Sequence, residues 1–193
     1  MFGLPPTIVV FDTEYTSWEG AQARKWSGPN EYREIVQIGA VRVDASTSDF
    51  KEVDSLLLYV KPVKNPTLSE YFIDLTGITQ ETVDTKGMTL TEVVQKLYTW
   101  SAGDTCYSWG LDGKDIENNC NLIAIEFPFE EDRFKDARET FSARGIEVNN
   151  YMSSTIVEAF GVKNTGRGHD GLEDARTIVE ALKLLAQQEN HVG

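Results

Sequence analysis

The sequence predicts a single α/β domain in which helices flank a mixed β-sheet. Two patterns carry this prediction. Short apolar, β-branched runs are concentrated in the first 60 residues, and helix-type periodicity alternates with one further strand in the rest of the chain. The length of 193 residues suits one domain, and hydrophobic and charged fractions of 40% and 25% are ordinary for a globular protein. We expect this domain to occupy residues 1–193.

Three strands are expected first. Apolar runs at residues 7–11, 34–43 and 56–60 have the length and the β-branched content of buried strands. A polar turn at residues 44–48 separates the second run from the third, which predicts antiparallel pairing of these two strands. Residues 15–33 contain Gly and Pro without periodicity, so we expect a loop between the first two strands.

Helices dominate the rest of the chain. Thr89 and Glu92 form a capping box for a helix that reaches about Trp100. Asp170 and Glu173 are expected to cap the last helix, whose apolar side chains recur at helical spacing. The other expected elements are a helix at 68–75, a strand at 105–109, a helix from Asp112 or Gly113 towards Ile125, and helices around 131–143 and 151–160.

Composition argues against several classes of protein. No apolar run approaches the roughly 18–20 residues of a membrane span, and the first six residues lack the features of a signal peptide, so we expect a cytoplasmic protein without a membrane partner. Two cysteines fit neither a disulfide framework nor a four-ligand zinc site. With 18 Lys and Arg against 31 Asp and Glu, the net charge of −13 disfavours broad binding to duplex nucleic acid. The same net charge is compatible with an enzyme that holds a few nucleotides through metal ions.

Asp12 and Glu14 directly follow the first apolar run. Side chains at positions i and i+2 of a strand point to the same face, so both carboxylates project together. Two carboxylates so close repel each other unless protons or cations intervene, and Mg²⁺ or Mn²⁺ would relieve the repulsion because both ions prefer oxygen ligands. A solvated strand end is the alternative interpretation of an isolated Asp-X-Glu motif.

Two other places in the chain carry similar chemistry. His169 lies in a glycine-rich loop, and Asp174 follows five residues later in the first turn of the last helix, so a base and a metal ligand can face one site. Asp112 follows the strand expected at 105–109. The alternatives are a surface histidine, an acid placed near a helix N-terminus by the helix dipole, and a helix cap at Asp112.

Together these residues resemble the DEDDh 3′–5′ exonuclease family, whose members share a ribonuclease-H-like fold. The stretches Glu34–Val41 and Leu75–Thr79 resemble the second strand and the Leu-Thr-Gly-Ile turn of that family, and the similarity extends over residues 7–185. Ser108-Trp109-Gly110 and Cys120 resemble the subgroup of KapD-like and histone-mRNA-type exonucleases. A histidine rather than a tyrosine before the last acid is typical of the h-type branch.

The resemblance implies that two divalent ions, Mg²⁺ or Mn²⁺, are bound by four carboxylates, those of Asp12, Glu14, Asp112 and Asp174. His169 would be the general base that deprotonates the attacking water. Only two residues separate Trp109 from Asp112, where we expect three from relatives with Trp-Gly at this point. Asp115, one helical turn further on, therefore remains an alternative to Asp112.

The resemblance also implies contacts with substrate. In that family the residues just after the first acids hold the terminal nucleotide, and here these are Thr13, Tyr15 and Thr16. Tyr15 could stack on a base, and Arg167 beside His169 could contact phosphate. Packing within the loop and solvated charge are the alternative roles for these side chains.

The function expected from the sequence is that of a metal-dependent 3′–5′ exonuclease. It would release nucleoside 5′-monophosphates from single-stranded ends, with RNA favoured over DNA by the subgroup resemblance. A DNA-directed proofreading or repair exonuclease is one alternative, and a non-catalytic nucleic-acid-binding or scaffold module on the same fold is another. Some relatives in the wider family dimerise, so a homodimer is left open.

Overall fold

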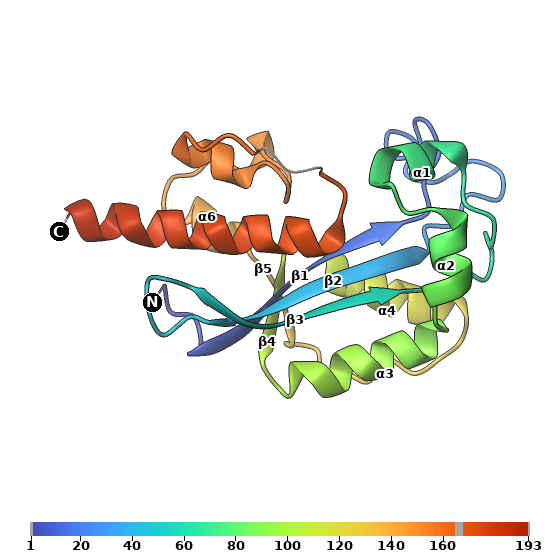
Figure 1. Ribbon diagram of the computed structural model, residues 1–193, viewed down its shortest axis with the longest axis horizontal. Helices are drawn as coiled ribbons and strands as arrows, with labels where there is room; N and C mark the ends of the chain where they lie inside the picture. The colour runs from blue at the N-terminus through green and yellow to red at the C-terminus, as the bar shows by residue number, and fades with distance from the viewer. Residues whose placement is uncertain (1, 165–167, 193) are drawn as a thin grey trace.

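A five-stranded mixed sheet forms the centre of the computed structural model, which describes residues 2–164 and 168–192 (Figure 1). The strands lie in the order β3-β2-β1-β4-β5. β1 pairs antiparallel with β2, and β2 with β3, whereas β4 runs parallel to β1 and β5 parallel to β4. The α/β class with a mixed sheet is therefore confirmed. The strand bounds are Thr7–Tyr15 for β1, Ile35–Asp44 for β2, Lys51–Tyr59 for β3, Thr105–Ser108 for β4 and Phe134–Asp136 for β5.

Helices cover both faces of the sheet. α6 (Gly171–Val192) crosses one face, and α3 (Leu90–Ser101) and α4 (Asp112–Leu122) lie on the other (Figure 1). In the described part of the chain, no helix combines the length and the apolar character needed to cross a membrane. The shorter helices are α1 (Glu70–Thr76), α2 (Gln80–Lys86), α5 (Arg138–Ser142) and the 3₁₀ turns η1 (Val148–Asn150) and η2 (Ile156–Phe160).

Side chains along β1 point alternately to the two faces of the sheet and contribute to an apolar layer on each face. Ile8 and Val10 pack in the cluster under α6, whereas Val9 and Phe11 pack in the cluster under α3 and α4. All four side chains are fully buried. The same alternation places the two acids that end β1 on the α6 face and Thr13 between them on the α4 face. The strand therefore positions its polar residues as well as its core.

The caps predicted at Thr89 and Asp170 are present, whereas the Glu173 side chain, which was also expected to cap the last helix, accepts a hydrogen bond from Arg176 instead. The Thr89 hydroxyl accepts a hydrogen bond from the Glu92 backbone N–H, and the Glu92 side chain accepts one from the Thr89 N–H, which completes the capping box of α3. At α6, Asp170 Oδ1 accepts from the N–H groups of Leu172 and Glu173 at 3.1 and 3.2 Å. Local side-chain chemistry determines where these two helices begin.

Two expected helices are wrong. Residues 131–143 contain β5 and then only the short α5, because Phe134 pairs with Cys106 and extends the sheet by one parallel strand. Nothing local in this charged segment signals that pairing. Residues 151–160 are helical only in the 3₁₀ turn η2, which buries Ile156 in the core under α6. Tertiary contacts override helix propensity in both places.

Two further differences concern polar elements. β3 begins at Lys51 rather than at residue 56, because its first half is an exposed edge with charged side chains and without an apolar run. The sequence does not predict the helix α2. It is short and polar, with only Val83 buried, and the Thr79 hydroxyl caps it by accepting from the Thr82 N–H. Both elements lack the periodicity by which sequence reasoning recognises a strand or a helix.

The first turn of α6 packs directly on the backbone of β2. A methyl group added to Gly39 would lie 2.0 Å from the Leu172 backbone nitrogen, and one added to Gly171 would lie 3.0 Å from the Asp12 carbonyl oxygen. The Gly171 N–H donates to Oε1 of the fully buried Gln37 at 2.7 Å. Because Gly39 is the partner of Asp12 in the sheet, this contact brings the start of α6 to the acids of β1.

Replacing Gly39 by Ala should force α6 away from β2. The added methyl would meet backbone atoms, and overpacking of this kind costs about 1–3 kcal/mol, or roughly 2–12 °C in melting temperature. Thermal unfolding followed by circular dichroism measures the loss. Gly145→Ala is the control, because no atom lies within 4 Å of its added methyl and only its left-handed backbone, at φ 81°, is strained. A Gly39→Ala variant that melts at the wild-type temperature would contradict the close packing of α6.

Candidate active site at the end of β1

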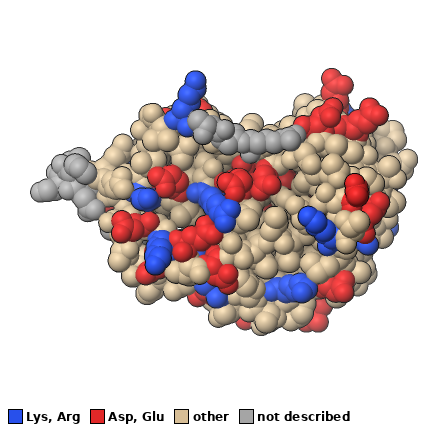
Figure 2. Space-filling model, viewed as in Figure 1, with Lys and Arg blue, Asp and Glu red and all other residues tan. Residues whose placement is uncertain are grey.

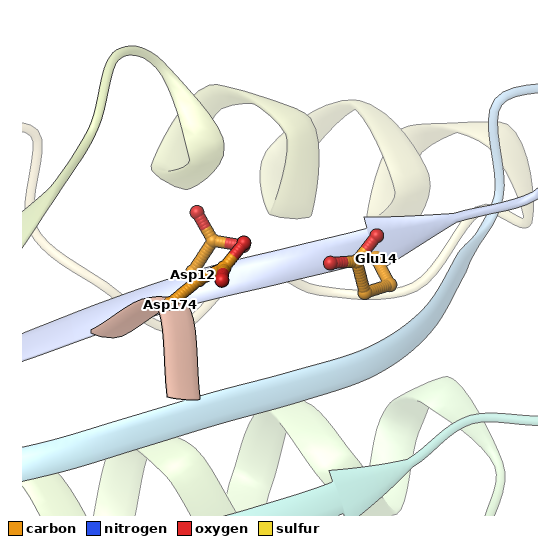
Figure 3. A group of neighbouring side chains, drawn as sticks. All are labelled: Asp12, Glu14 and Asp174. Atoms are coloured by element: carbon orange, nitrogen blue, oxygen red, sulfur yellow. The ribbon is translucent and has the colours of Figure 1, made fainter. Parts of the chain in front are cut away.

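Three carboxylates meet where β1 ends. Asp12 and Glu14 project from β1, and Asp174 comes from the first turn of α6 (Figure 3). One ligand atom from each residue lies within 4.8 Å of those from the other two. The three residues are only 7%, 8% and 3% exposed, respectively. Buried oxygen ligands at this spacing suit a hard divalent cation such as Mg²⁺ or Mn²⁺.

A fourth carboxylate approaches from the α4 side. Asp112 is the first residue of α4, and Thr13 Oγ1 donates to its Oδ1 at 2.7 Å. Its charge acts on Asp12, whose pKa it raises. Asp115 instead forms an ion pair with Arg33, whose Nη1 lies 2.7 Å from Oδ1 of Asp115. Asp112 thus interacts electrostatically with the acids of β1, whereas Asp115 is held by Arg33. A metal-ligand role for Asp112 stays a prediction.

Burial raises the pKa of every carboxyl in this cluster. The pKa of Asp12 is well above its usual range, first because of burial and then because of the charges on Asp112, Glu14 and Asp174. Burial is also the main cause that raises the pKa of Glu14 to about 9 and that of Asp174 to about 6. Four buried carboxylates oppose one another's ionisation. Bound cations would remove this repulsion, so the donor set fits divalent metal ions.

The segments before α6 support Asp174. Its Oδ2 accepts a hydrogen bond from Ser153 Oγ at 3.3 Å and one from the His169 backbone N–H at 3.2 Å. His169 adopts a left-handed backbone conformation, with φ 66°, which is uncommon for a residue with a side chain. Burial lowers the pKa of its imidazole from the ordinary value of 6.5. The ring is therefore mainly neutral at pH 7, as a proton acceptor must be.

The four residues expected to contact substrate occupy different places. Thr13 reaches the acids through the hydrogen bond described above. Tyr15 packs edge-on against Trp26, with 5.3 Å between ring centroids. Thr16 is 2% exposed and donates from Oγ1 to a backbone carbonyl of the following loop at 2.6 Å. Arg167 lies outside the described residues. Nucleotide contacts by these side chains stay predictions.

Sequence reasoning missed the residues that bring the acids together. Gly39, Gly171 and Gln37 form the contact between β2 and α6, and Ser153 holds Asp174. One signal was available, because a glycine in the interior of a strand often marks the close approach of another backbone. Nothing in the local sequence distinguishes Ser153 from a loop serine.

Known proteins resemble this chain along most of its length. The family model for exonucleases of the RNase T type matches residues 9–182. The chain belongs to this exonuclease family. The match runs from β1 into α6 and so includes every element that carries one of the four acids. The sequence-based assignment to the DEDDh exonucleases is confirmed.

Two relatives support the subgroup as well. The probable 3′–5′ exonuclease KapD of Bacillus subtilis is 28% identical over 196 residues, an alignment that covers 96% of this chain and 87% of KapD. Human 3′–5′ exoribonuclease 1 is 28% identical over 190 residues. That alignment covers 92% of this chain and 52% of the human protein, so the chain spans about half of the human enzyme's length.

A solved structure shares the fold. The crystallographic structure of the nuclease domain of 3′hExo, a DEDDh family member, bound to rAMP, superposes with a TM-score of 0.78 at 25% identity. The superposition covers 95% of this chain and 92% of that domain. The ribonuclease-H-like sheet predicted from the sequence is thereby confirmed. DEDDh exonucleases depend on divalent metal ions, and the buried acids of this chain fit that requirement.

Without metal, the acidic cluster should destabilise the protein as the pH rises. Because their pKa values are raised, the carboxyls keep their protons in the folded state at pH values where the unfolded chain, above about pH 4.5, has lost them. The free energy of unfolding therefore falls as the pH rises from about 4.5 towards the folded-state pKa of Glu14, about 9. In EDTA we expect a lower melting temperature at about pH 8 than at about pH 5.5. Mg²⁺ at about 100 times its Kd should restore roughly 5–10 °C at the higher pH.

Differential scanning calorimetry measures this pH dependence. Glu14→Gln should remove much of it, whereas Asp132→Asn, on an exposed loop, should leave it unchanged. A metal-free protein whose melting temperature does not fall between the two pH values would contradict the account of the cluster.

Replacing Asp112 should weaken metal binding, whereas replacing Asp115 should not. Asp112→Asn removes a carboxylate that lies among the acids, and Asp115→Asn removes one that pairs with Arg33. We expect isothermal titration with Mn²⁺ to show at least about a tenfold weaker Kd for the first variant and less than about a twofold change for the second. A larger effect at Asp115 would make it the fourth ligand.

Proposed function

We propose that the chain is a metal-dependent 3′–5′ exonuclease that removes nucleoside 5′-monophosphates from single-stranded ends and prefers RNA to DNA. The observation that carries this proposal is the group of three buried carboxylates at the end of β1, together with Asp112, whose charge raises the pKa of Asp12 and of Glu14. Two ions, Mg²⁺ or Mn²⁺, would bring four positive charges to four negative ones. The similarity to KapD and to human exoribonuclease 1 supports the direction of hydrolysis and the choice of polymer.

Different residues of the chain would have different roles in the reaction. The four carboxylates would hold two divalent ions, which when bound neutralise charge on the scissile phosphate and lower the pKa of the attacking water. His169, neutral at pH 7, would accept the proton of that water. Thr13 orients Asp112, and Ser153 together with the His169 backbone N–H orients Asp174. Burial keeps bulk water from competing with these contacts.

The distribution of charge favours a short single-stranded end as substrate. The net charge is −13, and on the face shown in Figure 2 the Lys and Arg side chains are interspersed with Asp and Glu rather than gathered into a basic band. Binding to a duplex depends on many contacts between basic side chains and phosphates. A strand end held mainly at the acidic cluster needs few such contacts.

The test is a gel assay with single-stranded RNA and DNA of matched sequence, labelled at the 5′ end, in Mg²⁺, in Mn²⁺ and in EDTA. We expect a metal-dependent ladder that shortens from the 3′ end, faster on RNA. Asp12→Asn should lower the rate at least about a hundredfold, and His169→Ala by about 10²–10⁴-fold, because they remove a metal ligand and the general base.

Matched controls are Asp132→Asn and His191→Ala, which should keep the wild-type rate. A faster ladder on DNA would assign the enzyme to DNA metabolism instead. Intact strands under every condition, from folded protein that binds the oligonucleotide, would favour a binding module without turnover.

A further inference from the structure

An arginine lies beside the acidic cluster, in the loop between β1 and β2. The Cζ atom of Arg33 is 3.7 Å from the centroid of the Tyr15 ring and 4.9 Å from that of Trp26. Its Nη1 donates to Asp115 Oδ1 at 2.7 Å. The side chain of Arg33 nevertheless remains 34% exposed. Two rings and one carboxylate therefore fix a guanidinium group that still reaches solvent.

The anchors of Arg33 place it at the rim of the candidate active site. Tyr15 directly follows Glu14 on β1, and Asp115 lies one helical turn after Asp112 on α4. The charge of Arg33 also acts on Asp112, where it opposes the effect of burial on the carboxyl pKa. Arg33 is thus next to the acids, on the side of the site where α4 begins.

The backbone that carries Arg33 is anchored too. The side chain of Asn119 on α4 accepts a hydrogen bond from the Ile35 N–H at 2.9 Å and donates one to the Arg33 carbonyl at 3.0 Å. Trp26 Nε1 donates to the Thr16 carbonyl at 2.9 Å, which holds the ring that Arg33 contacts. With backbone and side chain both held, a ligand that binds Arg33 would lose little affinity to the ordering of this side chain.

We propose that Arg33 binds a backbone phosphate of the substrate strand adjacent to the scissile one, and that Asp115, Tyr15 and Trp26 hold it in place for this contact. The inference rests on the proposed exonuclease function. A guanidinium donates strong hydrogen bonds to phosphate. Nε of Arg33 is buried and Nη1 pairs with Asp115, so Nη2 is the donor left for a phosphate. In a chain of net charge −13, a fixed cation beside the acids offsets their repulsion of the strand.

A different role for the same contacts is a latch that fastens α4, and hence Asp112, to the loop. The two roles differ in the substrates they affect. A latch would alter hydrolysis of every substrate, because it acts through a carboxylate of the cluster. A phosphate contact matters only for a substrate that has a phosphate beyond the scissile one.

Two substrates separate these roles. One is single-stranded RNA of about ten nucleotides, and the other is the 4-nitrophenyl ester of a nucleoside 5′-monophosphate, whose only phosphate is the scissile one. Arg33→Met should raise KM for the RNA about tenfold and lower the salt dependence of log KM by about 0.7. It should change kcat on RNA, and kcat/KM on the ester, by less than about twofold.

The matched control is Arg24→Met. Arg24 belongs to the same loop and also pairs with an acid, Glu31, but it contacts neither Tyr15 nor α4 in the described contacts. This variant should behave as wild type on both substrates. Arg33→Lys, which keeps the charge but not the planar fork, should recover part of the loss and tests the inference if Arg33→Met does not fold.

Equal losses on RNA and on the ester would identify a latch and overturn the inference, as would an Arg33→Met variant that matches Arg24→Met on RNA. If the wild-type protein cleaves neither substrate, the proposed function fails. The Arg33 contact is then decided by fluorescence anisotropy with the same RNA. Weaker binding by Arg33→Met than by Arg24→Met supports the contact, and equal binding overturns it.

Discussion

The distance between α6 and β2 controls whether the four acids can meet. Asp174 lies one turn into α6, and the helix reaches the end of β1 only because its first turn rests on Gly39. A side chain at that position would overlap backbone atoms of Leu172, which have no room to rotate away. The hydrogen bond from Gly171 to the buried Gln37 fixes the same contact from the side of the helix. The fold therefore assembles its site from three elements, β1, α4 and α6, through contacts between residues far apart in the chain.

The buried acids of the site lower the free energy of unfolding of the protein. Each carboxyl of the cluster is buried, and burial raises its pKa because the negative charge loses its solvation. Neighbouring carboxylates raise the pKa of Asp12 and Glu14 further. Two buried apolar layers, one on each face of the sheet, supply the stability that offsets this repulsion. Groups held in this way are poised to bind cations, and the energy released on metal binding includes the repulsion removed. Functional sites commonly trade stability for activity in this manner.

The sequence was informative where the determinants are local. Asp12 and Glu14 follow an apolar strand, so strand alternation alone predicts that they share a face, and helix caps at Thr89 and Asp170 mark where two helices begin. Family resemblance added Asp112 and left Asp115 as an alternative. That choice depends on a hydrogen bond from Thr13 and on the ion pair between Asp115 and Arg33, each joining residues more than 80 positions apart.

Other parts of the structure had no local signal. β5 is a three-residue strand in a charged segment, and it exists because β4 offers an edge to pair with. Ser153 resembles any loop serine until α6 brings Asp174 to it. The role of Arg33 could not be read from the sequence either, because its neighbours come from the end of β1, the following loop and α4.

We propose that the four acids bind two divalent ions together. Anomalous diffraction from crystals of the protein soaked in Mn²⁺ is the decisive measurement. We expect two manganese peaks about 3.5–4 Å apart, one in contact with Asp12, Glu14 and Asp174 and the other in contact with Asp112. The absence of any peak at the cluster, or a single peak that does not contact Asp112, would contradict it.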